Sequence, residues 1–268
     1  MHPVLWSYGS FRLPTYGLLL AVGLGLGIWT ASRLGRRKGM DSGRLLDFST
    51  WMIIAGLLGA KVLMIVSNGD YYFRNPGQIF SWGTLQAGGT FYGGFFAALF
   101  FAVYYIRVNQ MPMGKTLDVF APALALGHAV GRLGCFAAGC DYGKPTQSLL
   151  GVIYSNPVSH DLVGVPLGLR LHPTQLYEAA GNLVIFLGLL LAHRGKTRDG
   201  SIFLWYLLSY GALRFTVEMF RGDPGRGSYF GGLLSLPQLM SIAAAMTAII
   251  FMVYSRRRNA EAVSRSTA

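Results

Sequence analysis

The sequence predicts an all-α polytopic membrane protein with seven transmembrane helices. Hydrophobic residues make up 52% of its 268 residues and charged residues only 13%, about half the charged share of a typical soluble domain. So few charges cannot cover the surface of a soluble protein this long, and a disordered chain would need low hydrophobicity and high charge. The two cysteines exclude a disulfide-rich scaffold.

Seven segments are apolar enough to cross a bilayer, which takes about 20 helical residues. They are 13–32, 48–67, 88–106, 116–136, 173–192, 201–220 and 236–254. The fourth and fifth segments have the shortest uninterrupted apolar stretches.

The basic residues predict which loops face the cytoplasm. Fourteen of the 23 Lys and Arg residues fall in the loops that follow the first, third, fifth and seventh segments, and six fall in the others. Cytoplasmic loops carry such an excess, so we expect the N-terminus outside and the C-terminus inside. Most of the net charge of +12 is then topological, and nucleic acid is not an expected partner. We expect one membrane domain over 1–268, an outer-side loop region at 137–171 and a basic cytoplasmic tail at 255–268.

Glycines recur within the predicted spans at positions that favour close contact between helices. Gly23, Gly25 and Gly27 lie in the first segment with no strand before them, so helix packing explains them better than dinucleotide binding. Gly89 and Gly93 have the same interpretation in the third segment.

Ionisable residues inside spans are costly, which makes each a functional candidate. Lys61, Arg132 and Arg214 lie roughly 20 to 24 Å from the cytoplasmic ends of their spans, at the rise of an α-helix. Glu218 is one turn beyond Arg214. Further polar side chains start the inward-running spans: Tyr16, Tyr92, Tyr177 and Glu178. We therefore expect these groups to gather in the outer half of the membrane.

Several of these residues also have a purely structural interpretation. Arg214 and Glu218 are spaced i, i+4 and could neutralise each other. Lys61 could extend its ammonium to the outer headgroups. Tyr16 and Tyr92 could belong to an interfacial aromatic belt.

Arg132 is the hardest to explain structurally because it has no acidic residue one turn away on its own helix. It needs a partner from another helix or a ligand, and a guanidinium binds phosphate well. His128, one turn earlier, is expected to be a hydrogen-bonded core residue. Cys135 and Cys140 stand five apart without a histidine pair, a weak spacing for metal ligands. They could form a disulfide, but small buried thiols are favoured.

Five stretches of the sequence resemble motifs of the prolipoprotein diacylglyceryl transferases. Residues 131–143 (Gly-Arg-Leu-Gly-Cys-Phe-Ala-Ala-Gly-Cys-Asp-Tyr-Gly) are similar to the family signature Gly-Arg-x-Gly-Asn-Phe-x-Asn-Gly-Glu-x-x-Gly. The other matching stretches are 14–17, 88–94, 172–178 and 210–221. The resemblance implies seven spans with the N-terminus outside, in the cytoplasmic (inner) membrane of a bacterium.

The resemblance also implies a reaction and its residues. The diacylglyceryl group of phosphatidylglycerol moves to the lipobox cysteine of a preprolipoprotein, a thioether forms and glycerol phosphate leaves. The implied catalytic residues are Arg132, Arg214, Tyr92 and Glu218. The implied substrate-binding residues are Tyr16, Lys61, Cys135, Gly143, His172, Tyr177, Tyr210 and Arg221. No metal or organic cofactor is implied.

The chain departs from the family pattern at several of these positions. Cys135 and Ala138 replace the signature asparagines, and Cys140 replaces its glutamate. Tyr92 stands where the family has a histidine proposed as base, and a tyrosine with a pKa near ~10 is a poor base at neutral pH. Lys61 stands for the usual arginine of the second span. The field of the arginines could instead favour the substrate thiolate, since a free thiol titrates near ~8.5.

Two functions from other classes are weaker. A transporter or channel with an outward-facing anion site would need polar groups through both leaflets, and the inner halves of the spans have almost none. An intramembrane protease would need a Ser, Asp and His arrangement at membrane depth, which is not evident.

Overall fold

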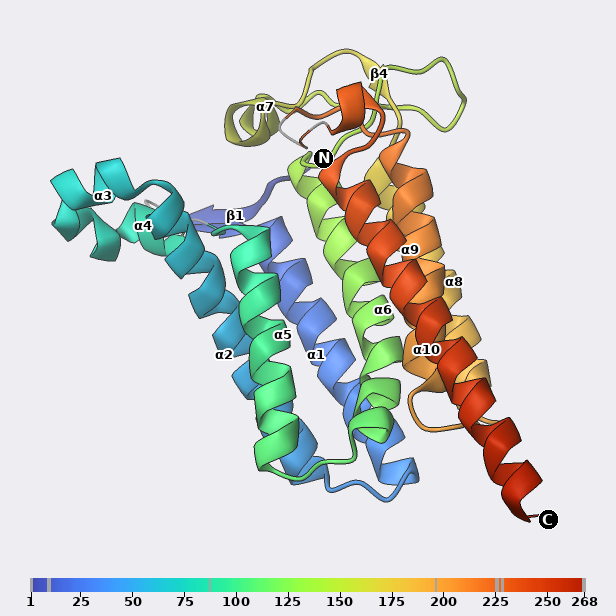
Figure 1. Ribbon diagram of the computed structural model, residues 1–268. Helices are drawn as coiled ribbons and strands as arrows, with labels where there is room; N and C mark the ends of the chain where they lie inside the picture. Colours follow the sequence, from blue (N-terminus) through green and yellow to red (C-terminus); the bar gives the residue numbers. More distant parts are fainter. Residues whose placement is uncertain are drawn as a thin grey trace. The chain divides into compact units, whose positions relative to one another are not determined.

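The computed structural model describes residues 2–8, 11–86, 88–195, 197–224, 227 and 229–266. The chain forms two compact units, Met1–Ala31 together with Leu117–Ala268, and Ser32–Thr116. The first is called the larger unit and the second the smaller unit. Figure 1 follows the chain through its helices.

Among the described residues, seven long helices match the seven predicted segments. They are α1 (Thr15–Arg37), α2 (Ser42–Ser67), α5 (Phe91–Val108), α6 (Met113–Ala138), α8 (Thr174–Ala192), α9 (Ser201–Glu218) and α10 (Leu236–Ser266). Six are long and apolar enough to cross a membrane, including the fourth and fifth segments. The exception is α9, because Arg214 and Glu218 lower its hydropathy. An all-helical, multi-pass membrane protein is confirmed, and the seventh span and the sidedness of the termini stay predictions.

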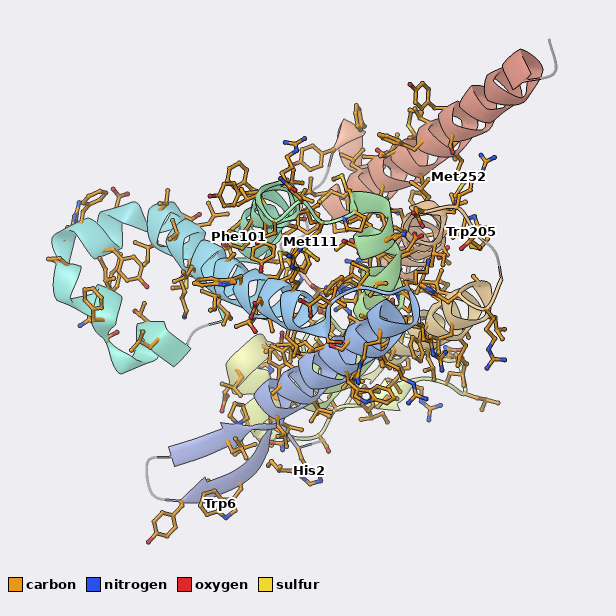
Figure 2. The ribbon with its side chains drawn as sticks, turned by 90° about the horizontal axis from the view of Figure 1, so that it is seen from below. His2, Trp6, Phe101, Met111, Trp205 and Met252 are labelled. Carbon is orange, nitrogen blue, oxygen red and sulfur yellow. The ribbon has the colours of Figure 1, made fainter. Side chains whose placement is uncertain are left out.

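Short elements occur between the long helices. The strands β1 (Val4–Tyr8) and β2 (Phe11–Pro14) form an antiparallel hairpin. The smaller unit adds α3 (Gly69–Arg74), η1 (Pro76–Phe80) and α4 (Trp82–Gln86). The α6–α8 connection contains β3 (Val152–Ile153), α7 (Pro157–Val163) and β4 (Arg170–Leu171), and η2 (Phe230–Gly232) precedes α10. On the hairpin, exposed Trp6 stacks on Tyr8 with 5.9 Å between ring centroids, and Figure 2 shows Trp6 at its edge.

The smaller unit is held by glycines between α2 and α5. A Cβ atom on Gly59 or Gly93 would overlap the backbone of the other residue. Gly89 has a φ of +76°, and the following Thr90 N–H donates to the Ala60 carbonyl at 3.0 Å. The helix packing predicted for Gly89 and Gly93 is confirmed, as small residues allow in a membrane.

The larger unit brings α6 against α1, α8 and α9. A Cβ on Gly23 would lie 3.1 Å from the Gly127 carbonyl, and one on Gly27 would lie 3.2 Å from that of Ala123. Gly25 has no such neighbour within 4 Å, so the packing prediction fails there. In Figure 1 helices α6, α8, α9 and α10 run side by side, with segment 139–173 across one end.

The helix α10 continues to Ser266 and thus into the predicted basic tail at 255–268. Residues 267–268 and the side chains of 256–266 lie outside the described residues.

Candidate active site

An ion-pair cluster joins the end of α6 to the start of α8 in the larger unit. Arg132 Nε lies 3.0 Å from Oε2 of Glu178, and Arg132 Nη1 pairs with Oδ2 of Asp141. The Glu178 side chain is only 2% exposed, whereas those of Arg132 and Asp141 are 20% and 31% exposed. Arg132 therefore has a partner on another helix and remains reachable from one side.

Asp141 links Arg132 to a second arginine. Its Oδ1 lies 2.7 Å from Nη2 of Arg221, whose guanidinium also binds Asp223 through Nε at 2.6 Å. Burial alone would raise the pKa of the Asp141 carboxyl, but the charges of Arg132 and Arg221 hold it below its ordinary value. Burial opposes the charge of Arg221 too, yet its hydrogen bond to Asp223 and both carboxylates raise its pKa. The three ion-paired side chains of Arg132, Asp141 and Arg221 are therefore all charged at neutral pH.

The turn after α6 sets the position of Asp141. Gly139 has a φ of +89°, and its N–H donates to the Cys135 carbonyl at 2.9 Å. Asp141 itself has a φ of +61°, a conformation that Asp tolerates better than most residues. The start of α8 then fixes the turn, because the Thr174 hydroxyl donates to the Asp141 carbonyl at 2.6 Å. The backbone thus aims the carboxylate at the arginines.

Gly143 brings this turn against the segment that carries Arg221. Its N–H donates to the His172 carbonyl at 3.0 Å, and it forms a β-bridge with Arg221. A Cβ on Gly143 would lie 2.5 Å from the His172 carbonyl oxygen and 2.9 Å from that of Phe220. Only glycine fits there. His172 Nδ1 hydrogen-bonds the Tyr177 hydroxyl at 3.1 Å, so these two residues support the same junction.

Helix α9 presents Tyr210, Arg214 and Glu218 at i, i+4 spacing on one face. The Tyr210 hydroxyl donates to Glu178 Oε1 at 3.2 Å. Arg214 Nη1 lies 2.8 Å from Glu218 Oε2, with side-chain exposures of 13% and 1%. The Ser235 hydroxyl donates to the other Glu218 oxygen at 2.8 Å. Arg214 and Glu218 do pair, and Glu218 holds the arginine in place.

The remaining candidates of the larger unit surround Arg132. His128 hydrogen-bonds the Tyr206 hydroxyl at 3.3 Å, which confirms it as a hydrogen-bonded core residue. A Cβ on Gly134 would lie 3.2 Å from the Tyr16 ring, so Tyr16 packs on α6 beside Cys135. Cys135 Sγ is 4.0 Å from Arg132 Nη1. Both cysteines are free thiols.

Lys61 and Tyr92 belong to the smaller unit, whereas Arg132, Arg214 and Arg221 belong to the larger one. The Lys61 ammonium donates to the carbonyls of Thr84 at 2.5 Å and Leu85 at 3.1 Å. It therefore ties α2 to α4. Tyr92 makes an edge contact with Phe91, with 5.5 Å between ring centroids. Their roles toward a substrate stay predictions.

Known proteins are similar to this chain over nearly its whole length. The family model described as prolipoprotein diacylglyceryl transferase matches residues 3–254. The chain belongs to this family. A phosphatidylglycerol–prolipoprotein diacylglyceryl transferase of Finegoldia magna is 31% identical over 96% of this chain and 97% of its own length. That of Clostridium tetani is 30% identical over 96% and 99%, and that of Dehalococcoides mccartyi 31% identical over 97% and 96%.

Membership in the prolipoprotein diacylglyceryl transferases makes the chain a transferase of lipoprotein processing. The cluster around Arg132 also contains residues to which the sequence assigned no role. The sequence indicates only a membrane depth for Glu178 and no role for Asp141. The one sequence signal for Asp141 is an acid within the glycine-rich stretch that follows Arg132.

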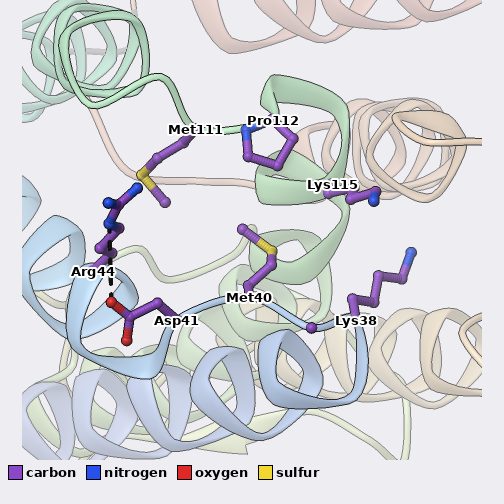
Figure 3. A pocket seen from close by; sticks show the side chains of 8 residues that line it. Lys38, Met40, Asp41, Arg44, Met111, Pro112 and Lys115 are labelled. Atoms are coloured by element: carbon purple, nitrogen blue, oxygen red, sulfur yellow. Dashed lines mark ion pairs between the residues drawn. The ribbon is translucent and has the colours of Figure 1, made fainter.

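A cavity of about 290 Å³ lies elsewhere, within the smaller unit. Figure 3 shows Lys38, Arg44 and Lys115 at its edge and the side chains of Met40 and Met111 between them. None of its lining residues is among the predicted site residues of this transferase. The three basic residues belong to the loops and helix starts that are expected on the cytoplasmic side. The cavity therefore lies on the predicted cytoplasmic side and is not part of the candidate active site.

Proposed function

We propose that the protein transfers the diacylglyceryl group of phosphatidylglycerol to the lipobox cysteine thiol of preprolipoproteins. The products are a thioether-linked lipoprotein precursor and glycerol phosphate. The observation that carries the proposal is the paired set of arginines, Arg132 and Arg214, each held by a buried carboxylate. The names of the relatives supply the substrate class.

The arginines have a clear part in this chemistry. As the bond between the diacylglyceryl carbon and the phosphate oxygen breaks, negative charge grows on the phosphate. Fixed cations in a water-poor site stabilise such charge without reorganising. Glu178 orients the Arg132 guanidinium and Glu218 orients that of Arg214, so both are ready before the substrate arrives.

The other site residues act around this pair. Arg221 and Asp141 extend the cluster toward the α6–α8 connection, where a phosphate could displace Asp141 from one guanidinium. Tyr16, Cys135 and Tyr210 line the neighbourhood of Arg132 and contact the substrates. Gly143, His172 and Tyr177 shape the junction beside Arg221. For Tyr92 and Lys61 we propose the roles that the family resemblance implies, catalytic and substrate-binding. In this proposal the site faces the outer half of the cytoplasmic membrane, and α9 also crosses it, as the sixth of seven spans.

The test is a reconstituted transfer assay. The full chain, purified in lipid nanodiscs, is incubated with phosphatidylglycerol and a lipobox peptide, and the peptide mass is followed. We expect the mass of a diacylglyceryl thioether with the native chain and with Arg170→Ala, an exposed arginine outside the cluster. Arg132→Ala should give about 10²-fold less product or lower still. Absence of the thioether with a folded native preparation contradicts the proposal.

A further inference from the structure

The turn after α6 gathers three side chains that bind metal ions. The sulfur atoms of Cys135 and Cys140 and a carboxylate oxygen of Asp141 all lie within 4.8 Å of one another. Two sulfurs at about 2.3 Å from a zinc ion in tetrahedral geometry stand roughly 3.8 Å apart. The cluster therefore needs side-chain movements on the order of one ångström to close around an ion. The spacing along the sequence concealed this, because the turn at Gly139 brings the second thiol back.

The backbone that carries the three ligands is fixed on both sides. The Gly139 N–H and the Cys140 thiol both point at the Cys135 carbonyl, at 2.9 and 3.7 Å. From α8, Gln175 Nε2 donates to the Cys140 carbonyl at 2.5 Å and the Thr174 hydroxyl donates to that of Asp141 at 2.6 Å. Ligand backbones held in this way reduce the entropy that metal binding must overcome.

The nearby arginines do not oppose a dication at this place. A dication that binds two thiols releases two protons, so the net charge of the cluster stays the same. A carboxylate has about four lone-pair sites, and its ion pairs with Arg132 and Arg221 use one on each oxygen. Such outer hydrogen bonds orient metal-bound carboxylates. Two thiolates with one carboxylate favour zinc over calcium or magnesium.

We propose that Cys135, Cys140 and Asp141 bind a zinc ion whose fourth coordination position receives the lipobox thiol as a thiolate. The inference rests on the proposed function. Three protein ligands and one open position are the pattern of catalytic zinc, and a coordinated thiol is deprotonated outright. The ion would supply what Tyr92 cannot, because the chain has a tyrosine where its family has a histidine proposed as base.

The step balances without an oxidant or reductant. The lipobox thiol binds zinc in place of water and gives its proton to solvent. The thiolate sulfur attacks the diacylglyceryl carbon that bears the phosphate oxygen, a carbon–sulfur bond forms, and the carbon–oxygen bond breaks with its electron pair on oxygen. Arg132 Nη1 is 4.0 Å from the Cys135 sulfur, so in this step it would lie beside both the ion and the leaving phosphate. The neutral thioether is a weaker ligand than the thiolate and leaves the ion.

The first experiment measures metal binding without reference to activity. The full chain in nanodiscs is loaded with zinc, or with cobalt as a spectroscopic probe, and analysed for metal content and for thiolate-to-cobalt charge-transfer absorption. We expect one equivalent per chain, lost in Cys140→Ser and in Cys135→Ser. Asp223→Asn is the matched control, because Asp223 binds the same Arg221 outside the cluster and its loss should leave the absorption intact.

Specific outcomes overturn the zinc site. They are a folded native chain that binds no cobalt through thiolate, an absorption that persists in Cys140→Ser, and a Cys135–Cys140 disulfide in active protein. If a cysteine variant fails to fold, alkylation of the native chain replaces it. Zinc should then protect both thiols at least tenfold, and equal alkylation rates with and without zinc contradict the site.

The second experiment separates the zinc inference from the proposed function. Transfer to the lipobox peptide is measured before and after chelation, and again after zinc is restored. We expect a loss of about tenfold or more that zinc reverses. Full transfer by a metal-free chain overturns the inference and leaves the proposed function standing. Zinc bound through both thiols, with no thioether product, removes the proposed function while the metal site stands.

Discussion

Two carboxylates at opposite ends of α6 are used in different ways. Asp118, near the start, is fully buried, and its oxygens accept the N–H groups of Gly200 at 2.8 Å and Phe203 at 2.9 Å. Asp141, just beyond the end, is 31% exposed and binds two guanidinium groups. Backbone donors cannot move away from Asp118, whereas a substrate anion can compete with Asp141 for its arginines. The first carboxylate holds the start of α9, and we propose that the second takes part in the chemistry.

Removal of Arg132, at the end of α6 that faces Asp141, should have the largest effect on the rate of transfer. Arg132→Ala takes away a cation of the proposed site and leaves Glu178 buried without its guanidinium. We expect transfer to fall by about 10²-fold or more, as for other fixed groups that stabilise transition-state charge. Arg132→Lys keeps the charge but not the fork, so it should recover part of the activity. Equal rates for Arg132→Ala and the Arg170→Ala control would remove the end of α6 from the mechanism.

Asp118→Asn tests the carboxylate near the start of α6, which holds the start of α9. One backbone N–H of α9 then faces an amide group in place of a carboxylate oxygen, and a buried donor without its acceptor costs about 1–3 kcal/mol. We expect a lower thermal midpoint in nanodiscs and nearly unchanged transfer per folded molecule. A variant with native stability would show that Asp118 does not hold α9.

Asp141→Asn should give the opposite result. Asp141 is 31% exposed, and Arg132 and Arg221 each keep a second carboxylate partner, so its loss should lower the free energy of unfolding by about 1 kcal/mol or less. Transfer should fall by about tenfold, because Asp141 orients the guanidinium groups of Arg132 and Arg221, and groups that orient a site commonly contribute this much. The comparison fails if Asp141→Asn destabilises the chain as much as Asp118→Asn and leaves its activity intact.

The pH dependence of stability offers a finer test of Asp141. Its pKa lies below the ordinary value in the folded chain, so its ion pairs stabilise the fold fully above the unfolded pKa of about 3.9. That contribution disappears as the pH falls through the lower folded pKa. The difference in thermal midpoint between the native chain and Asp141→Asn should be constant from pH 7 to about 5 and shrink below about 4. A difference that vanishes near neutral pH contradicts the ion pairs.

Tyr92→Phe should have the smallest effect. If the arginines, with or without an ion, favour the substrate thiolate, the Tyr92 hydroxyl only positions a substrate, and we expect less than about a threefold loss of transfer. Inactivity equal to that of Arg132→Ala would show that Tyr92 takes part in the proton transfer.

Local patterns predicted the helices, and distant contacts determined most of the site. Apolar length predicts all seven helices, and the spacing of Gly89 and Gly93 predicts the close helix packing that is found between α2 and α5. The partner of Arg132 could not be predicted, because Glu178 reaches it from another helix across a long connection. The position of Asp141 depends on two positive φ angles in one turn, those of Gly139 and of Asp141 itself, which no periodicity encodes. Lys61 binds carbonyls of a short helix that apolar length does not indicate.

The left-handed backbone at Asp141 restricts how this sequence can change over evolutionary time. Few residue types adopt a φ of +61° at low cost, chiefly Gly, Asn and Asp. Of these, only Asp carries a charge. A lineage that loses this aspartate would therefore pass to a neutral residue, and recovering an acid there would require either Asp again or a rebuilt turn. The conformation of one residue thus leaves Asp as the one residue type that can supply a negative charge at this position without strain.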